Sequence, residues 1–255
     1  MPDTINKDVI TEDGFLDNSF AVLQPKKGAH RAGLDAVLLA ACVPVERNGL
    51  VADFGAGTGV AGMAVAQRCP QAQVELIEND AETVDLLRRT LILSRNFHIA
   101  DRLSVTEADV TTLDRPRFSH IIANPPFNAR GQQPSPHTRR AAAHIADPSL
   151  FEEWIEAAKR TVLSNGHLTM IVRAESQADI ETAMAGSFGN RLVLPIVAKP
   201  DREPIRIIIT GQQGGADNTH ELPPLILHQP DGRFTDQVED ILRGRAGLDL
   251  HNMSA

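Results

Sequence analysis

Short apolar runs alternate with helix-like segments through the middle of this 255-residue chain, and this alternation restricts its fold more than any other feature. The runs expected as strands are 50–54, 73–78, 103–106, 119–123 and 166–173. The segments expected as helices are 34–41, 59–68, 80–93, where Asp80 can cap the helix, and 148–163. Strands joined by helical crossovers run parallel, and helices then cover both faces of their sheet.

The chain changes character after residue 173. Runs 191–198 and 205–210 are rich in β-branched residues, and the segment between them is too short for a helical crossover. These two strands should therefore pair antiparallel. The predicted fold class is α/β, a Rossmann-like and mostly parallel sheet with one antiparallel closing strand.

Two domains are expected on this pattern. Residues 1–45 should form an N-terminal extension with a short hairpin and a helix, in which the polar first fifteen residues fray and 20–24 is a strand. Residues 46–255 should form the main domain, including a C-terminal tail that is extended at 225–228 and helical at 235–243.

A glycine-rich loop joins the first parallel strand to its helix, with the sequence Asp53-Phe54-Gly55-Ala56-Gly57-Thr58-Gly59. Glycines at such a turn let the backbone approach a ligand at the carboxyl edge of the sheet. Two ligand classes fit the spacing. Gly57, Gly59 and Gly62 also satisfy the dinucleotide pattern G-x-G-x-x-G, and Glu78 lies where that pattern places its ribose-binding acid.

Three features favour S-adenosylmethionine (SAM) over a nicotinamide dinucleotide. Asp53 ends the strand, and its carboxylate would repel a pyrophosphate but attract an ammonium group. Asp109 follows the third strand and can accept a hydrogen bond from an adenine amino group. The fourth strand ends in the box Asn124-Pro125-Pro126-Phe127, which has no role in a dehydrogenase.

Together, the glycine loop, the acid ending the second strand and the Asn-Pro-Pro-Phe box resemble class I SAM-dependent methyltransferases that act on amino nitrogens. The resemblance implies that Asp53, Gly55, Gly57 and Gly59 surround the methionine part of S-adenosyl-L-methionine. It also implies that Glu78 binds the ribose hydroxyls and that Asp109 binds the adenine.

The Asn-Pro-Pro-Phe box suits methylation of a conjugated nitrogen. The lone pair of such a nitrogen is delocalised, so two fixed acceptors, the Asn124 side-chain oxygen and the Pro125 carbonyl, can turn it toward the methyl donor. Pro125 and Pro126 stiffen the loop because each ring fixes φ. Phe127 can stack on a planar target. These four residues are the predicted catalytic group.

Several substrates fit such a site. The segments Ala32–Ala40, Pro224–His228 and Asp231–Thr235 resemble bacterial tRNA adenine-N6 methyltransferases, which modify the adenine beside the anticodon of a valine tRNA. That family often has Tyr where this chain has Phe127. Phe at this position also resembles ribosomal RNA guanine-N2 methyltransferases, although those usually continue with His rather than Asn128. A glutamine amide of a protein, or a SAM-binding module without catalysis, are further alternatives.

Charge and composition are compatible with an RNA partner in the cytoplasm. The formal net charge is −8, yet basic residues gather in segments 24–34, 128–146 and 199–206. The predicted substrate-binding residues are eight cations of these segments, namely Lys26, Lys27, Arg31, Arg130, Arg139, Arg140, Lys199 and Arg202. No apolar stretch suits a membrane span, no export signal is evident, and no Cys/His cluster has metal-ligand spacing. Cys42 and Cys69 are expected to be small buried thiols.

Overall fold

The computed structural model describes residues 10–26, 33–126, 148–250 and 253. The main sheet has nine strands, in the order β10-β8-β9-β7-β6-β3-β4-β5, with β11 also paired to β8. Its strands are β3 (Gly49–Phe54), β4 (Ala72–Glu78), β5 (Leu103–Glu107), β6 (Phe118–Ala123), β7 (Val162–Arg173), β8 (Phe188–Val197), β9 (Pro204–Gln213), β10 (Thr219–Glu221) and β11 (Leu225–Ile226).

Strand β9 is antiparallel to both of its neighbours, β7 and β8, while every other pair in this sheet is parallel. The short turn between β8 and β9 leaves no room for a crossover helix, so β9 has to return antiparallel. The prediction of a mostly parallel α/β sheet with one antiparallel strand is confirmed.

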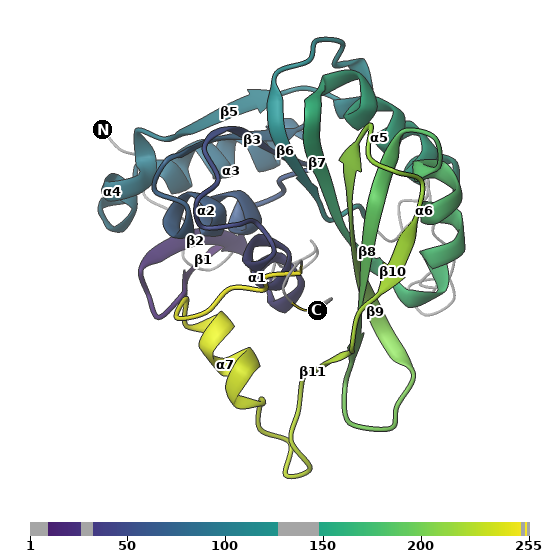
Figure 1. The fold of residues 1–255 in the computed structure, drawn as a ribbon. Helices are drawn as coiled ribbons and strands as arrows, with labels where there is room; N and C mark the ends of the chain where they lie inside the picture. Colours follow the sequence, from purple (N-terminus) through teal and green to yellow (C-terminus); the bar gives the residue numbers. More distant parts are fainter. Residues whose placement is uncertain (1–9, 27–32, 127–147, 251–252, 254–255) are drawn as a thin grey trace, which may run out of the picture.

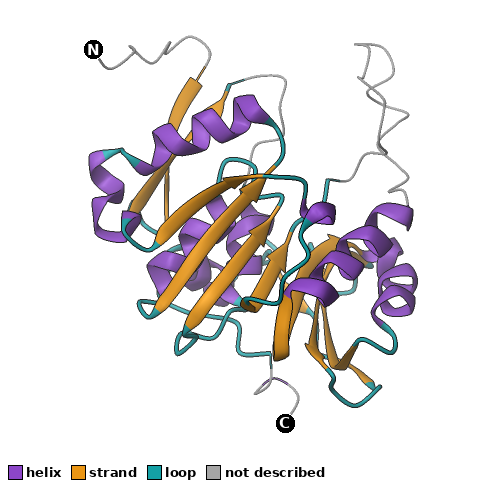
Figure 2. Cartoon of the chain, turned by 90° about the horizontal axis from the view of Figure 1, so that it is seen from above, coloured by secondary structure: helices purple, strands orange, loops and turns teal. Residues whose placement is uncertain are grey.

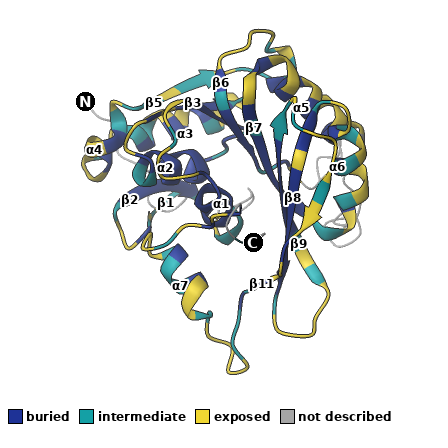
Figure 3. Ribbon diagram, viewed as in Figure 1, coloured by how far each residue is buried: buried dark blue, intermediate teal, exposed yellow. Residues whose placement is uncertain are grey.

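Helices lie on both sides of the sheet, as the views in Figures 1 and 2 show. One hydrophobic cluster contains residues of α1, α2 and α7, and a second cluster contains residues of α5 and α6. The helices are α1 (Leu34–Ala41), α2 (Val60–Arg68), α3 (Ala81–Leu91), α4 (Phe97–Ala100), α5 (Pro148–Thr161), α6 (Gln177–Met184) and α7 (Asp236–Leu242). The buried strands between the two layers stand out in Figure 3. No helix in the described part of the chain is long and apolar enough to cross a membrane.

Side chains alternate between the two faces along β6, β7 and β9. On the face that α1 covers, the apolar residues Ile122, Ile171 and Ile208 lie in the same cluster as α1. The residues at i±2 along the strands share that face. Along β6, Asn124 therefore lies on this face at the carboxyl edge of the sheet, and His120 lies on it toward the amino edge. The apolar middle of the face separates them.

The prediction that the first fifteen residues fray is wrong for residues 10–15. They form β1 (Ile10–Phe15), which pairs antiparallel with β2 (Phe20–Pro25). The sequence of β1 is largely polar because only part of it is buried, and its order comes from the backbone ladder and from stacking of Phe15 on Phe20. Because no side chain of β1 is fully buried, its sequence does not show the alternation of apolar and polar residues that would predict a strand. The short helices α4 and α6 and the strand β10 were not predicted either.

Asn96 attaches β2 to the rest of the molecule. Its fully buried side chain accepts a hydrogen bond from Ala21 N (2.9 Å) and donates to Ala21 O (2.8 Å) and Thr90 O (2.7 Å). Thr90 adds a fourth bond by accepting from Leu23 N. The buried backbone of β2 thus finds its partners in α3 and in the turn that follows it.

We expect Asn96→Ala to lower the free energy of unfolding by about 2–4 kcal/mol, because it leaves the buried N–H and C=O of Ala21 without partners. It also removes one bond to Thr90 O, which still accepts from Leu93 N. Urea denaturation followed by circular dichroism measures this. Asn79→Ala, at an exposed position after β4, is the matched control and should change stability by less than about 0.5 kcal/mol. Equal effects of the two substitutions would contradict the role assigned to Asn96.

Candidate functional site

A cavity of about 720 Å³ opens at the carboxyl edge of the parallel strands. The ends of β3, β4 and β6 meet there because parallel strands finish on the same side. Residues of β2, α1 and α5 complete the wall. The lining includes Pro25, Ala36, Asp53, Gly55, Gly57, Thr58, Glu78, Asn79, Ala108, Asp109, Asn124, Pro125, Pro126, Trp154, Arg173 and Arg206.

Two glycines shape the loop between β3 and α2. Gly55 has φ +64°, and a Cβ there would lie only 2.5 Å from the Trp154 ring. Gly57 has φ +55°, but a Cβ there would meet nothing within 4 Å because it would point into open space. Gly55 is therefore required by packing, whereas Gly57 leaves its backbone accessible to a ligand in the cavity.

Asp53, at the end of β3, is buried, with 2% of its surface exposed. Its Oδ2 accepts a hydrogen bond from Gly62 N in the first turn of α2, at 2.8 Å. Burial raises the pKa of the Asp53 carboxyl to about 7, the Gly62 N–H opposes this rise, and the negative charge of Glu78 adds to it. A cationic group in the cavity would stabilise the ionised carboxylate, whereas a phosphate would not.

Glu78 fastens the glycine loop to the end of β4. Its Oε2 accepts from Gly57 N at 2.9 Å, and its Oε1 accepts from Asn79 N at 2.9 Å and Asp80 N at 3.0 Å. Each carboxylate oxygen retains acceptor capacity beyond these bonds. The predicted cap of α3 is Asp80, and this is confirmed by its bond from Thr83 N.

Asp109 follows β5 and begins the short 3-10 turn η2 (Val110–Thr112). Its Oδ1 accepts from Thr111 N at 2.9 Å and from Thr111 Oγ1 at 2.8 Å. These two bonds orient the carboxylate at the cavity wall, and its second oxygen is left for a donor such as an amino group.

Asn124 stands at the end of β6, next to the cavity. Its Oδ1 is buried and has no hydrogen-bond partner among the described residues. A buried amide oxygen without a donor is costly, so a functional reason is expected. Pro125 is buried and Pro126 is exposed, and both line the cavity. Phe127, predicted to stack on the target, lies outside the described residues.

Two arginines at the cavity escaped the sequence prediction as site residues. Arg173 ends β7 and pairs in register with Arg206 of β9, and both line the cavity. Arg206 Nε donates to Asp35 Oδ2 of α1 at 2.9 Å. Both were visible as cations at strand ends, but only the antiparallel register of β7 and β9 places them side by side. Trp154, the single tryptophan of the chain, was also missed, because the packing of α5 against the glycine loop places it at the cavity.

The predicted basic residues are only partly described. Lys26 is exposed and follows Pro25 of the cavity wall. Lys199 and Arg202 are exposed in the turn between β8 and β9, at the edge of the sheet where β8 ends. The others, Lys27, Arg31, Arg130, Arg139 and Arg140, lie outside the described residues. Within the described ranges there is no cluster of three His, Cys, Asp or Glu side chains able to hold a metal ion.

The geometry fits SAM better than a dinucleotide. Asp53 accepts a hydrogen bond from a backbone N–H at the N-terminus of α2, where a pyrophosphate would otherwise bind. A second acid, Glu78, is hydrogen-bonded to the loop. The acids Asp53, Glu78 and Asp109 suit an ammonium group, ribose hydroxyls and an amino group. The fold and the site therefore define a class I, SAM-dependent methyltransferase.

Comparison with known proteins places the chain within this class. The family model for the methyltransferase small domain matches residues 31–199, and the chain belongs to that family. It is 33% identical over 162 residues to a tRNA1(Val) (adenine(37)-N6)-methyltransferase of Flavobacterium psychrophilum, covering 62% of this chain and 67% of the relative. It is 30% identical over 199 residues to an enzyme of the same name from Shewanella halifaxensis, covering 73% and 76%.

Among solved structures, the chain resembles a predicted O-methyltransferase from Agrobacterium tumefaciens. The TM-score is 0.73 and the identity 34%, covering 84% of this chain and 98% of that one. The nicotinamide alternative is therefore set aside. The protein is an enzyme, a SAM-dependent methyltransferase, and its cofactor is S-adenosyl-L-methionine.

We expect Gly57→Ala to weaken SAM binding by about tenfold or more, because a side chain would occupy the space where the backbone meets the ligand. Isothermal titration calorimetry measures the affinity. Gly186→Ala is the matched control, since Gly186 also has positive φ (+71°) and open space but lies after α6. The control should bear the same backbone strain and bind SAM normally. A loss of binding in both variants would assign the effect to strain.

The raised pKa of Asp53 predicts how SAM affinity depends on pH. Ionised Asp53 is predicted to attract the cofactor's ammonium group. SAM affinity should therefore fall as pH decreases through about 7 and the carboxylate takes up a proton. Asp53→Asn keeps an oxygen for Gly62 N but no charge, and it should bind more weakly above pH 7 without this component of the pH dependence. Calorimetry between about pH 6 and about pH 8 compares the two, and the cofactor's own titration is common to both. Parallel pH profiles would contradict the assignment.

Proposed function

We propose that this enzyme methylates an exocyclic amino nitrogen of a nucleobase, and that its substrate is adenine N6 in tRNA, at the position beside the anticodon. The observation that carries the proposal is the unpartnered, buried Oδ1 of Asn124 at the cavity wall. An amino group entering the cavity would supply the missing donor. The names of the relatives from Flavobacterium psychrophilum and Shewanella halifaxensis support the choice of tRNA adenine.

Four elements of the chain would hold the cofactor. Asp53 faces its ammonium group, the Gly57 backbone approaches its methionine part, Glu78 accepts from the ribose hydroxyls, and Asp109 accepts from the adenine amino group. Gly55 and Gly59 keep the loop in its turn. SAM, when bound, supplies an electrophilic methyl group on a sulfonium. The unused oxygen of Asp109 and the remaining acceptor capacity of Glu78 support these roles.

The target nitrogen is a weak nucleophile because its lone pair is delocalised into the ring. Asn124 Oδ1 and the Pro125 carbonyl would accept its two N–H groups and turn the lone pair toward the methyl carbon. Binding both reactants in one cavity supplies proximity. Pro125 and Pro126 restrict the loop and so keep the two acceptors in place. The nitrogen becomes acidic once methylated, so its proton leaves without a strong general base.

RNA would be held by cations at the same edge of the sheet. Arg173 and Arg206 line the cavity itself. Lys26 is exposed next to Pro25 of the cavity wall, and Lys199 and Arg202 are exposed in the turn between β8 and β9. The Asp35–Arg206 bond orients one of these cations at the cavity. Phosphate contacts of this kind give affinity without reading the base sequence.

The experiment incubates the enzyme with methyl-labelled SAM and separate pools of tRNA, ribosomal RNA, DNA and protein, followed by nucleoside analysis. Label in N6-methyladenosine of tRNA is the expected result. Label in N2-methylguanosine of ribosomal RNA, or in glutamine of protein, would overturn the tRNA assignment. Label on an oxygen, the chemistry named for the relative from Agrobacterium tumefaciens, would overturn nitrogen transfer altogether.

We expect Asn124→Ala to lower kcat by about 100-fold or more, while SAM affinity stays within a few-fold, because Asn124 acts on the acceptor nitrogen. Single-turnover kinetics and calorimetry measure the two quantities. Asn48→Ala, in the exposed connection before β3 at the opposite edge of the sheet, is the matched control and should leave both unchanged. Full turnover in Asn124→Ala, or an equal loss of SAM binding, would argue against this role.

A further inference from the structure

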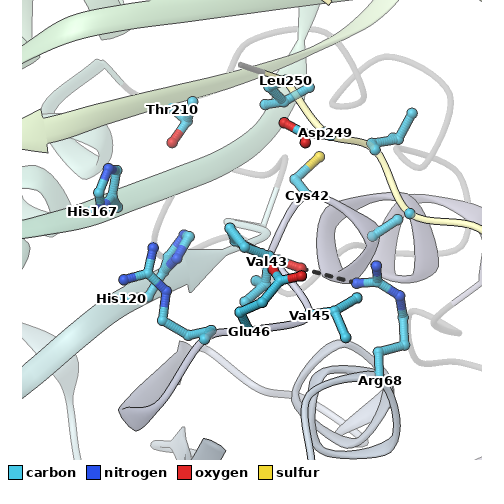
Figure 4. Close-up of a pocket in the computed structure, with 15 residues that line it drawn as sticks. Cys42, Val43, Val45, Glu46, Arg68, His120, His167, Thr210, Asp249 and Leu250 are labelled. Atoms are coloured by element: carbon cyan, nitrogen blue, oxygen red, sulfur yellow. Dashed lines mark hydrogen bonds between the residues drawn. The ribbon is translucent and has the colours of Figure 1, made fainter. Parts of the chain in front are cut away.

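A second cavity, of about 230 Å³, lies at the amino edge of the parallel strands, opposite the SAM-binding edge. Its wall comes from β6, β7 and β9, from the connection between α1 and β3, and from the C-terminal segment that follows α7. Figure 4 shows His120, His167 and Thr210 on one side of it, with Arg68 on the other. Nothing in the proposed methyl transfer uses this cavity.

His120 is the most buried titratable group of this cavity. Only 2% of its surface is exposed, and its Nε2 lies 2.8 Å from Thr169 Oγ1, which in turn lies 2.8 Å from Thr210 Oγ1. Its Nδ1 is buried and has no partner among the described residues. Burial, with smaller contributions from the charge of Arg47 and from His167, holds the pKa of His120 well below its usual range, so the ring is neutral.

Arg47 supplies a positive charge to the same cavity. Its Nε is buried, and no hydrogen bond or ion pair satisfies it within the described part of the chain. Arg68, in contrast, is part of the wall, because its Nη1 donates to the carbonyls of Ala40 and Val43. The acids at this cavity, Glu46 and Asp249, are exposed.

Two unsatisfied polar atoms, one on a guanidinium and one on a neutral imidazole, therefore face one small space. A guanidinium whose buried Nε has no carboxylate partner favours an anionic ligand with oxygen acceptors. In the structure Thr169 Oγ1 donates to Thr210 Oγ1, and His120 Nε2 can then donate to Thr169. Because hydroxyl groups rotate, Thr169 can instead donate to His120 Nε2 when an acceptor enters the cavity. The ring then carries its proton on Nδ1 and becomes a second donor toward the cavity.

We propose that this cavity binds a small oxyanion, a phosphate or carboxylate group, between the Arg47 guanidinium and His120 Nδ1. The site is separate from the methyl-transfer cavity. Ile122, Ile171 and Ile208 lie between the two on the same sheet face, within the cluster that α1 covers. Anion binding in this cavity is therefore independent of which substrate the enzyme methylates.

The first test titrates the protein with inorganic phosphate and, separately, with succinate, at constant ionic strength, by calorimetry. Saturable binding of at least one is expected in the parent protein and in Arg115→Gln, a control that removes the same charge from an exposed side chain (89%). Arg47→Gln should bind about tenfold or more weakly, the scale of one charge-assisted hydrogen bond. No saturable binding of either anion, or equal binding by Arg47→Gln, would overturn the proposal.

Phosphate could also bind the arginines of the RNA surface, so a second measurement reports on this cavity alone. Nitrogen NMR of the His120 ring, assigned with His120→Gln, should show the Nδ1-protonated form increasing as the bound anion is added. This readout does not use Arg47→Gln, so it tests the proposal even if that variant fails to fold. An unchanged His120 signal at saturating anion would overturn the proposal. Methyl transfer by folded Arg47→Gln should stay within a few-fold of the parent.

Discussion

The hydrogen bond from Gly62 N to Asp53 Oδ2 connects the end of β3 to the first turn of α2. The Gly62 N–H is in the first turn of α2 and has no acceptor within the helix, so the Asp53 carboxylate satisfies it. That carboxylate is almost completely buried. The loop between Asp53 and Gly62 must therefore turn sharply. Glu78 holds the loop a second time, through Gly57 N. The floor of the cofactor cavity is built from these two carboxylate-to-backbone contacts.

These contacts also bring two carboxylates to the same glycine loop and so concentrate negative charge there. Two carboxylates lie close enough for Glu78 to contribute to the raised pKa of Asp53, which burial already raises. Within the described part of the chain, no Lys or Arg side chain pairs with the Asp53 carboxylate. Such a site favours a ligand that brings a positive charge, and SAM does so with its ammonium and sulfonium groups. The same arrangement disfavours a pyrophosphate.

Helix α1 divides one face of the sheet into two functional edges. Ala36, near its start, lines the cofactor cavity, while Ala41 and Cys42, at its end, line the second cavity. An eight-residue helix spans about 12 Å, which is enough to cover the apolar middle of the face. Asp35 also holds Arg206 beside the cavity that contains Asn124. The N-terminal segment thus lines the cavity at the carboxyl edge, although the sequence pattern places it before the first parallel strand.

The sequence by itself determined the strand–helix alternation, the antiparallel β9, the glycine loop and the positions of Asp53, Glu78, Asp109 and Asn124. These depend on local rules, namely hydrophobic period, turn residues and the fact that parallel strands end at one edge. Only the tertiary structure placed Arg173 against Arg206 and Trp154 against Gly55. It also brought His120 and Arg47 to one cavity. Those contacts join residues far apart in the chain, and strand register and helix docking, which leave no local pattern, decide which of them meet.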